Sequence, residues 1–454
     1  MPWCQIIMFS KILIANRGEV AIRVIRACKE MGIPTVAIFS MADRDALHVS
    51  LADESYCVGG VSAADSYLNM SAVLTAAVAS GATAIHPGYG FLSENAKFAS
   101  ICRDCNITFI GPPPEVITKM GDKDAARRAM LAAGVPVIPG SDILNNVEAA
   151  KKAAEKIGYP VLLKARAGGG GKGIRLVKKP SETENAFNMA KNEALASFSD
   201  GALYMEKFLT HVKHVEAQIL SDNNGNTVVL GERECSIQRR NQKLIEECPS
   251  PAVNSEIRKK IIKAVQKAAS YVGYRNAGTI EFLLDKDGKF YFMEMNTRLQ
   301  VEHGVTEMVT GIDIVKWQIR IAAGMPMAFS QADIAINGNA IECRINAENP
   351  LLDFRPSAGT VNLLHFPGGP WVRNDSALYQ NYTIPPFYDS LIAKIMVHGK
   401  TREEAIRKMQ AALCELVIEG VDHNAEYLGG ILSDSAFKAG DFYIDFLSKR
   451  PKGN

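Results

Sequence analysis

Residues 294–302 carry polar and apolar side chains in alternation. The polar side chains belong to Glu294, Asn296, Arg298, Gln300 and Glu302. Alternate side chains of an extended chain share one face, so this face holds the polar groups while the other meets a core. In a straight strand the first and last carboxylates would lie roughly 26 Å apart. We therefore expect the strand to bend into a loop along an elongated active-site cleft, with a solvated edge strand as the alternative.

The preceding residues predict a β-hairpin that adds another carboxylate. Residues 277–285 and 289–296 have the composition of strands, and Asp287-Gly288 between them is a two-residue turn signal. Counting outward from this turn places Glu281 directly opposite Glu294. Like charges at that spacing are destabilising unless a cation lies between them. With Asn296 they offer the hard oxygen ligands that Mg²⁺ takes beside phosphate oxygens, whereas the alternative is a solvated carboxylate pair.

A run of glycines at residues 168–171 lies between two predicted strands. Successive glycine amides can form a concave anion site, and a flexible loop of this kind suits a lid that closes on a nucleotide. Lys164 and Lys172 flank the run, which favours phosphate binding over a merely flexible turn. No GxxxxGK[ST] sequence occurs, so this is not a Walker loop.

Two further segments could contact a nucleotide or an anion. Glu206 lies in a strand predicted at residues 204–209 and could accept a hydrogen bond from an adenine amino group, with the backbone of residues 207–209 pairing with the ring edge. The basic residues at 238–243 precede the acidic hairpin. They indicate either an anion site or an ordinary solvated face.

The elements that must position these groups follow an α/β order. Near the N-terminus, strands are predicted at residues 11–15, 35–39, 82–86 and 107–110, and helices at 19–31, 68–80 and 91–105. Strands alternating with helices predict a parallel sheet covered on both faces. One glycine at Asn16-Arg-Gly-Glu does not make a dinucleotide fingerprint, so a Rossmann-like domain without a nicotinamide or flavin is expected.

Length and composition limit the remaining classes. The 454 residues indicate two to four domains. The net charge of +2 predicts neither nucleic-acid nor membrane binding, and no apolar run is long enough to span a bilayer. Nine scattered cysteines are typical of a reduced, cytoplasmic enzyme rather than a disulfide framework.

Several motifs together resemble the ATP-grasp biotin carboxylases, nearly from end to end of the chain. They are Asn16-Arg-Gly-Glu, the segment from His86 to Asn95, Met120-Gly-Asp-Lys, the Lys164 strand with its glycine loop, Met205-Glu-Lys, Gln238-Arg-Arg, the Glu281 hairpin, the segment from Glu294 to His303, and the segment from Glu342 to Glu348. The resemblance implies an α/β fold, α+β overall. It would comprise a Rossmann-like domain at residues 1–121, an ATP-grasp domain at 122–330 with a mobile lid at about 138–210, and a small β-rich domain at 331–454.

The resemblance also implies an activity, namely carboxylation of biotin with ATP and bicarbonate through carboxyphosphate, as in acetyl-CoA carboxylase. ATP would contact Lys123, Lys164, Gly170, Gly171, Glu206, Lys207, Phe208, Leu209, His214 and Asn241. Mg²⁺ (or Mn²⁺) would bind Glu281, Glu294 and Asn296. Bicarbonate would meet Lys243, Arg298, Gln300 and the Val301 amide, with Glu302 as the base and Arg344 stabilising the biotin enolate.

The implied partners are a separate biotin carboxyl carrier protein and carboxyltransferase subunits. The chain contains no Met-Lys-Met sequence, the site at which biotin is attached in the family's carriers, so biotin is expected as a carrier-bound substrate and not on this chain. A homodimer is expected, although Pro370 and Trp371 depart from the family at a segment used in dimers.

Other departures affect the site itself. Asn241 replaces a usual histidine, Arg166 a small residue, and Gly304 a proline beside the base. Two alternatives stay open: a different ATP-grasp carboxylate–amine ligase, and a regulatory subunit that binds nucleotide without catalysis.

Overall fold

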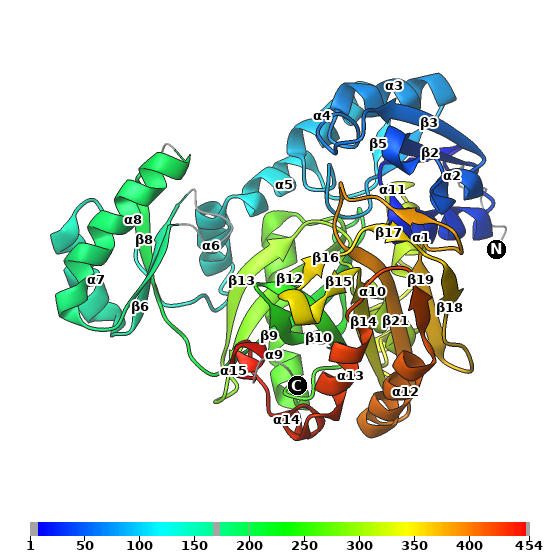
Figure 1. The fold of residues 1–454 in the computed structure, drawn as a ribbon. Coiled ribbons are helices and arrows are strands. Elements are labelled where there is room, and N and C mark those ends of the chain that lie inside the picture. The colour runs from blue at the N-terminus through cyan, green and yellow to red at the C-terminus, as the bar shows by residue number, and fades with distance from the viewer. Residues whose placement is uncertain (1–7, 167–172, 199, 451–454) are drawn as a thin grey trace.

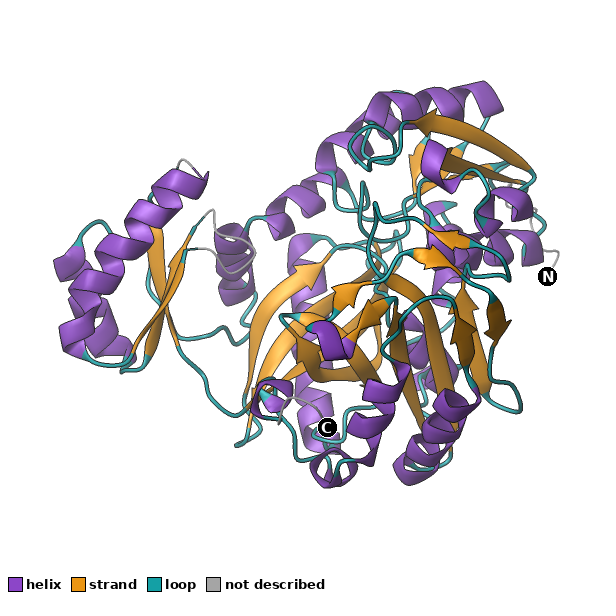
Figure 2. Ribbon diagram, viewed as in Figure 1, coloured by secondary structure: helices purple, strands orange, loops and turns teal. Residues whose placement is uncertain are grey.

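The computed structural model describes residues 8–166, 173–198 and 200–450 (Figure 1). The predicted contacts at Gly170 and Gly171 lie outside these residues. The mixed α/β architecture is confirmed, with a parallel sheet near the N-terminus and a large antiparallel sheet at the centre (Figure 2). None of the described helices is both long and apolar enough to cross a membrane.

The N-terminal sheet is parallel, with the strand order β3-β2-β1-β4-β5. Its three inner strands are short and buried between helices, as the alternating pattern predicts, whereas the two edge strands are partly exposed. The elements are β1 (Ile12–Ile14), α1 (Gly18–Glu30), β2 (Thr35–Ser40), η1 (Met41–Asp43), α2 (Leu47–Leu51), β3 (Glu54–Gly59), α3 (Met70–Ser80), β4 (Ala84–His86), α4 (Ala96–Asp104) and β5 (Thr108–Phe109).

The helix expected at residues 91–105 is too long by several residues. Phe91 has a left-handed backbone with φ of 43°, and the helix begins only after Asn95, whose side chain accepts from the Phe98 amide at 2.9 Å. The Asn95 side chain pairs with the Phe98 amide, which has no partner within the helix, and so sets the start of the helix. The residues before Asn95 therefore form a turn. The proline-rich boundary also leads directly into α5 (Pro114–Gly121), because proline is well suited to the first helical turn.

A separate lobe contains the predicted lid (Figure 1). Its sheet has the order β7-β6-β8, and its own apolar core joins that sheet to two helices. The elements of this lobe are α7 (Val147–Ile157), β6 (Val161–Ala165), β7 (Ile174–Val177), η2 (Pro180–Glu182), α8 (Thr183–Phe198) and β8 (Leu203–Lys207), and α6 (Lys123–Ala132) precedes it.

The central sheet has eight strands in the order β13-β12-β9-β10-β11-β14-β21-β19. The C-terminal strands therefore continue the sheet that carries the acidic hairpin, with β14 beside β11 and β21 beside β14. Its strands are β9 (Val212–Ser221), β10 (Thr227–Arg239), β11 (Gln242–Cys248), β12 (Asn276–Asp285), β13 (Phe290–Asn296), β14 (Asn339–Asn346), β19 (Val372–Ser376) and β21 (Leu391–Gly399).

Helices cover this sheet, and small strand pairs flank it. The helices are α9 (Ser255–Val272), α10 (His303–Thr310), α11 (Ile314–Ala322), α12 (Arg402–Glu415), α13 (Ala425–Ser433), α14 (Ser435–Ala439) and α15 (Phe446–Lys449), with η3 (Gln331–Asp333) and η4 (Pro350–Leu352). The short strands are β15 (Glu348–Asn349), β16 (Arg355–Pro356), β17 (Gly359–Thr360), β18 (Leu363–His365), β20 (Thr383–Ile384) and β22 (Val417–Glu419).

Candidate active site

The acidic hairpin places Glu281 opposite Glu294, as predicted, but by a different route. The turn is not the expected two-residue loop, because the Asp285 amide donates to the Lys289 carbonyl and leaves residues 286–288 as the loop. Gly288 has φ of 76°, the left-handed conformation that such a loop requires. A bulge then falls between the pairs Phe282–Phe292 and Glu281–Glu294, so Met293 is the extra residue that restores the predicted pairing.

The strand ends at Asn296 and bends before α10, which brings distant carboxylates together. The ammonium of Lys243 donates to Glu281 Oε1 at 3.1 Å and to Glu302 Oε1 at 2.7 Å. One cation therefore bridges Glu281 of the hairpin and Glu302 at the far end of the polar stretch.

Glu302 is fully buried, and both of its carboxylate oxygens are paired. Lys243 bonds Oε1, and Arg344 Nη2 donates to Oε2 at 2.8 Å. Burial opposes ionisation, but Lys243, Arg344 and Arg233 outweigh it and hold the pKa of Glu302 well below its ordinary value. The carboxylate is consequently anionic at neutral pH, the state that a proton acceptor needs.

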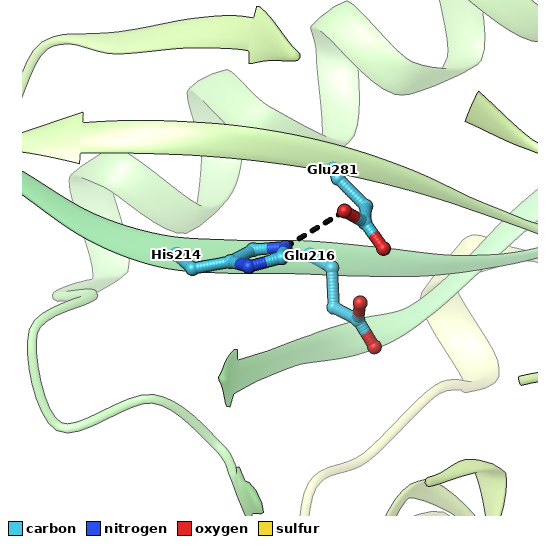
Figure 3. Close-up of side chains that lie close together, drawn as sticks. All are labelled: His214, Glu216 and Glu281. Atoms are coloured by element: carbon cyan, nitrogen blue, oxygen red, sulfur yellow. Dashed lines mark ion pairs between the residues drawn. The ribbon is translucent and has the colours of Figure 1, made fainter. Parts of the chain in front are cut away.

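Glu216 and Arg233 are site residues that the sequence reasoning missed. Arg233 Nε donates to Glu216 Oε1 at 2.6 Å, and Lys243 donates to Glu216 Oε2 at 2.6 Å. Figure 3 shows Glu216 beside His214 and Glu281, and the His214 ring lies 2.9 Å from Glu281 Oε2. These three residues could by type hold a metal, but the oxygens of Glu216 are already bonded to two cations.

The predicted set Glu281, Glu294 and Asn296 fits a divalent cation better. Among the ion pairs of the described residues, none includes Glu294, and burial together with the charge of Glu281 raises the pKa of Glu294. The Asn296 amide donates to Glu281 Oε1 at 2.8 Å, and its oxygen accepts from Arg298 at 3.0 Å. A buried carboxylate raised in pKa by a like charge is stabilised by a cation, so the donor set suits Mg²⁺.

A cleft of about 1230 Å³ gathers most of the predicted residues. It is lined by Lys123, Lys164, Glu206, His214, Asn241, Lys243, Glu281, Glu294, Asn296, Arg298, Gln300, Val301 and Arg344. Within it, Lys164 forms an ion pair with Glu206 across neighbouring strands of the lid lobe. Residues from the lid lobe and the central sheet thus face one space.

The predicted backbone contact at residues 207–209 is not among the lining of this cleft. The Lys207 amide donates to Pro139 O at 2.8 Å and the Phe208 amide to Pro160 O at 3.1 Å. The Lys207 side chain donates to the carbonyls of Gly158 and Tyr159. Two of the three amides are therefore already used, and a contact to an adenine ring by a free amide could come only from Leu209.

Arg298 is oriented by an exposed carboxylate and Arg344 by a buried one. Arg298 Nε donates to Glu94 Oε2 at 2.8 Å, which ties this loop to the N-terminal domain. Arg344 Nε donates to Glu246 Oε1 at 2.6 Å from the neighbouring strand β11. The sequence reasoning assigned no role to Glu94 or Glu246, because their partners lie far away in the chain.

The comparisons with known proteins agree with this geometry. Family models match the biotin carboxylase N-terminal domain at residues 8–117, the carbamoyl-phosphate synthase L chain ATP binding domain at 122–329 and the biotin carboxylase C-terminal domain at 342–449. Biotin carboxylase 1 of Bacillus subtilis is 54% identical over 97% of this chain and 98% of its own length.

Solved structures agree as well. A biotin carboxylase–βγ-ATP complex from Campylobacter jejuni superposes with a TM-score of 0.93 at 47% identity, over 97% of this chain and 99% of the other. The biotin carboxylase domain dimer of Hydrogenobacter thermophilus 2-oxoglutarate carboxylase, with MgADP and bicarbonate, gives a TM-score of 0.91 at 52% identity, over 97% and 98% of the two chains. This chain belongs to the biotin carboxylase family of ATP-dependent ligases.

Proposed function

We propose that this chain carboxylates biotin with ATP and bicarbonate, and that the biotin is held on a separate carrier protein. The observation that carries the proposal is the buried anionic carboxylate of Glu302, which is paired with two cations that line the cleft, Lys243 and Arg344. A buried anion bonded to two cations is suited to exchange one of those bonds for an anionic substrate.

The first step is bicarbonate activation. Lys243, Arg298 and the Val301 amide hold the bicarbonate, which replaces one of the cation bonds now made to Glu302. Glu302 takes the bicarbonate proton as a bicarbonate oxygen attacks the γ-phosphorus of ATP, and the bond to the β-phosphate oxygen breaks. The products are ADP and carboxyphosphate.

The second step transfers carbon to biotin. Carboxyphosphate splits into CO₂ and phosphate within the cleft. The released phosphate takes the ring N–H proton of biotin, and that nitrogen then attacks CO₂. Arg344 stabilises the negative charge that develops on the ureido oxygen by charge-assisted hydrogen bonding.

Nucleotide and metal bind at the other end of the cleft. Lys123, Lys164, His214 and Asn241 contact ATP, and Glu206 becomes available to the adenine once Lys164 turns to phosphate. Mg²⁺ held by Glu281, Glu294 and Asn296 would neutralise charge on the ATP phosphates. The three domains proposed above, bounded at residues 121/122 and 330/331, place this end between the lid and the central sheet.

The test uses free biotin in place of the carrier. ADP formation is measured with ATP and Mg²⁺, with and without bicarbonate, biotin and a panel of amines. The proposal requires ADP formation that depends on bicarbonate and rises with biotin. Stimulation by an amine instead would identify a carboxylate–amine ligase, and nucleotide binding without turnover would identify a regulatory subunit.

The partners and setting follow from the same proposal. The chain pairs with a second copy, receives biotin from a carrier protein and supplies a carboxyltransferase that makes malonyl-CoA in the cytoplasm. Adding purified carrier and acetyl-CoA carboxyltransferase tests this part, because malonyl-CoA would then form. The 2-oxoglutarate carboxylase relative is nearly as similar as the Bacillus protein, so overall identity does not separate the possible acceptors.

A further inference from the structure

Three successive carbonyl groups of the loop before α10 are each held by a side chain. Arg298 Nη1 donates to Leu299 O at 3.1 Å, His303 Nδ1 lies 2.8 Å from Gln300 O, and Lys394 Nζ donates to Val301 O at 2.7 Å. A carbonyl oxygen only accepts, so Nδ1 of His303 carries its proton. Because these carbonyls are tied down, the directions of the intervening peptide groups are fixed.

Lys394 reaches this loop from the C-terminal strand β21. Its side chain is fully buried, and its charge is balanced by Glu19 of α1 at 3.3 Å and by Asp375 of β19 at 3.9 Å. Burying an ammonium is costly unless it is paired and hydrogen-bonded. Here the two carboxylates that balance the charge of Lys394 come from the N-terminal and C-terminal parts of the chain. The shortest hydrogen bond of Lys394 goes to the Val301 carbonyl.

His303 is the first residue of α10 and is also fully buried. Burial lowers the pKa of its imidazole to about 3, so the ring is neutral at the pH of an assay. A neutral ring with its proton on Nδ1 is a single fixed donor to Gln300 O. It therefore orients the residue whose side chain accepts from Arg298 Nη1 at 3.1 Å.

We propose that Lys394 and His303 are positioning residues that hold Gln300 and Val301 in the geometry that binds bicarbonate. Neither touches the reacting atoms; each acts through a backbone carbonyl. This inference rests on the proposed function, in which Val301 offers its amide to bicarbonate. Losing either bond frees the Gln300–Val301 peptides and weakens bicarbonate binding, while the nucleotide end of the cleft keeps its contacts.

The first test compares two buried lysines. Lys394→Met preserves the length of the side chain but removes the donor, and we expect the KM for bicarbonate to rise roughly tenfold, as for the loss of one charged hydrogen bond, with the KM for ATP within about twofold of wild type. Lys213→Met is the matched control, because Lys213 is also buried in the central sheet and donates to a backbone carbonyl, Gly440 O at 2.8 Å. The control should leave the KM for bicarbonate unchanged.

The second test does not depend on how well a lysine variant folds. His303→Asn retains a nitrogen donor close to the position of Nδ1, whereas His303→Leu removes it. We expect the KM for bicarbonate to remain near wild type in the first variant and to rise in the second. Circular dichroism and thermal melting show that each variant used is folded.

The outcomes distinguish failure of the proposed function from failure of the positioning role of Lys394 and His303. A wild-type chain without bicarbonate-dependent ADP formation would overturn the proposed function. An active wild type whose His303→Leu and folded Lys394→Met variants keep the KM for bicarbonate would overturn the positioning role. Equal rises in the KM for bicarbonate and for ATP would also overturn it, because the residues would then be structural.

Discussion

Glu281 and Glu294 are direct cross-strand neighbours because Met293 is an inserted residue in β13. The three-residue turn would otherwise place Met293, not Glu294, opposite Glu281. The bulge thus turns the second carboxylate onto the face that holds Lys243 and His214, where burial and like charge raise its pKa. A divalent cation bound here would offset the repulsion between the two carboxylates.

Glu294→Gln should sharply weaken metal-dependent ATP turnover. A neutral amide cannot balance the cation, so the Mg²⁺ concentration for half-maximal turnover should rise at least tenfold. The measurement is an Mg²⁺ titration of ADP formation, with Glu155→Gln on α7 as an exposed control. Wild-type turnover at limiting Mg²⁺ would remove Glu294 from the metal site.

Gly304 is matched to Met396 on β21. A Cβ atom built on Gly304 would lie 2.2 Å from Met396 Sδ, so Met396 occupies the space that a side chain at position 304 would need. Gly304→Ala should therefore destabilise the protein by about 1–3 kcal/mol through overpacking. Met396→Ala should destabilise the wild-type protein, and it should destabilise the Gly304→Ala variant by less. Thermal melting of wild type, the two single variants and the double variant measures the interaction energy between positions 304 and 396. If the two single effects simply add in the double variant, the two residues are not packed against each other as described.

Three fully buried histidines should make the protein sensitive to acid. Burial lowers the pKa of His48 and His86 to about 4 and that of His303 to about 3. Between about pH 6.5 and pH 4 the unfolded chain binds protons on these rings while the folded protein does not, so stability falls as the pH falls. Each ring contributes about 1.4 kcal/mol per pH unit in that window.

Thermal melting from pH 7.5 to pH 5 measures this effect. His48→Gln keeps a donor toward Ile38 O, which His48 Nε2 contacts at 3.2 Å, but cannot titrate. The variant should lose less stability than wild type over this range. An identical pH dependence would show that the buried ring of His48 does not contribute.

Glu246 should control how well Arg344 supports carboxylation. Burial raises the pKa of Glu246 to about 7 although Arg344 opposes the shift, and Glu302 and Lys243 are the other charged groups that affect it. Above that pH the ionised carboxylate holds Arg344 Nε, so the biotin-dependent rate should rise as the pH passes through about 7. Glu246→Gln should lower this rate about tenfold and remove that step. A pH–rate profile unchanged by the variant would contradict the role.

Part of the site could be predicted because Glu294 and Asn296 lie two residues apart on one strand, β13. Period-two spacing identified Glu294 and Asn296, and the turn signal located Glu281 even though the turn and the bulge were both misjudged. The two errors cancelled, since each shifts the register by a single residue. Without the bulge, the pairing of Glu281 with Glu294 that was predicted from the turn would have been wrong by one residue.

The site residues that were not predicted lie on long strands that are buried on both faces, where polar residues do not stand out as one exposed face. Glu216 lies between the apolar residues Val215 and Ala217 on β9, a signal of the same kind that could have identified it. Arg233, Glu246 and Lys394 are brought to the site only by the strand order of the central sheet, which joins distant segments. Their partners cannot be read from local spacing.

The role of Glu302 is the centre of the account, and isotope transfer tests it most directly. Wild type and Glu302→Gln are incubated with ATP, Mg²⁺, free biotin and ¹⁴C-bicarbonate, and acid-labile ¹⁴C-carboxybiotin is counted alongside an ATP titration. We predict biotin labelling by wild type, and in Glu302→Gln a rate reduced roughly 10²–10⁴-fold with ATP affinity near wild type. No labelling by wild type, or full labelling by Glu302→Gln, would contradict the account.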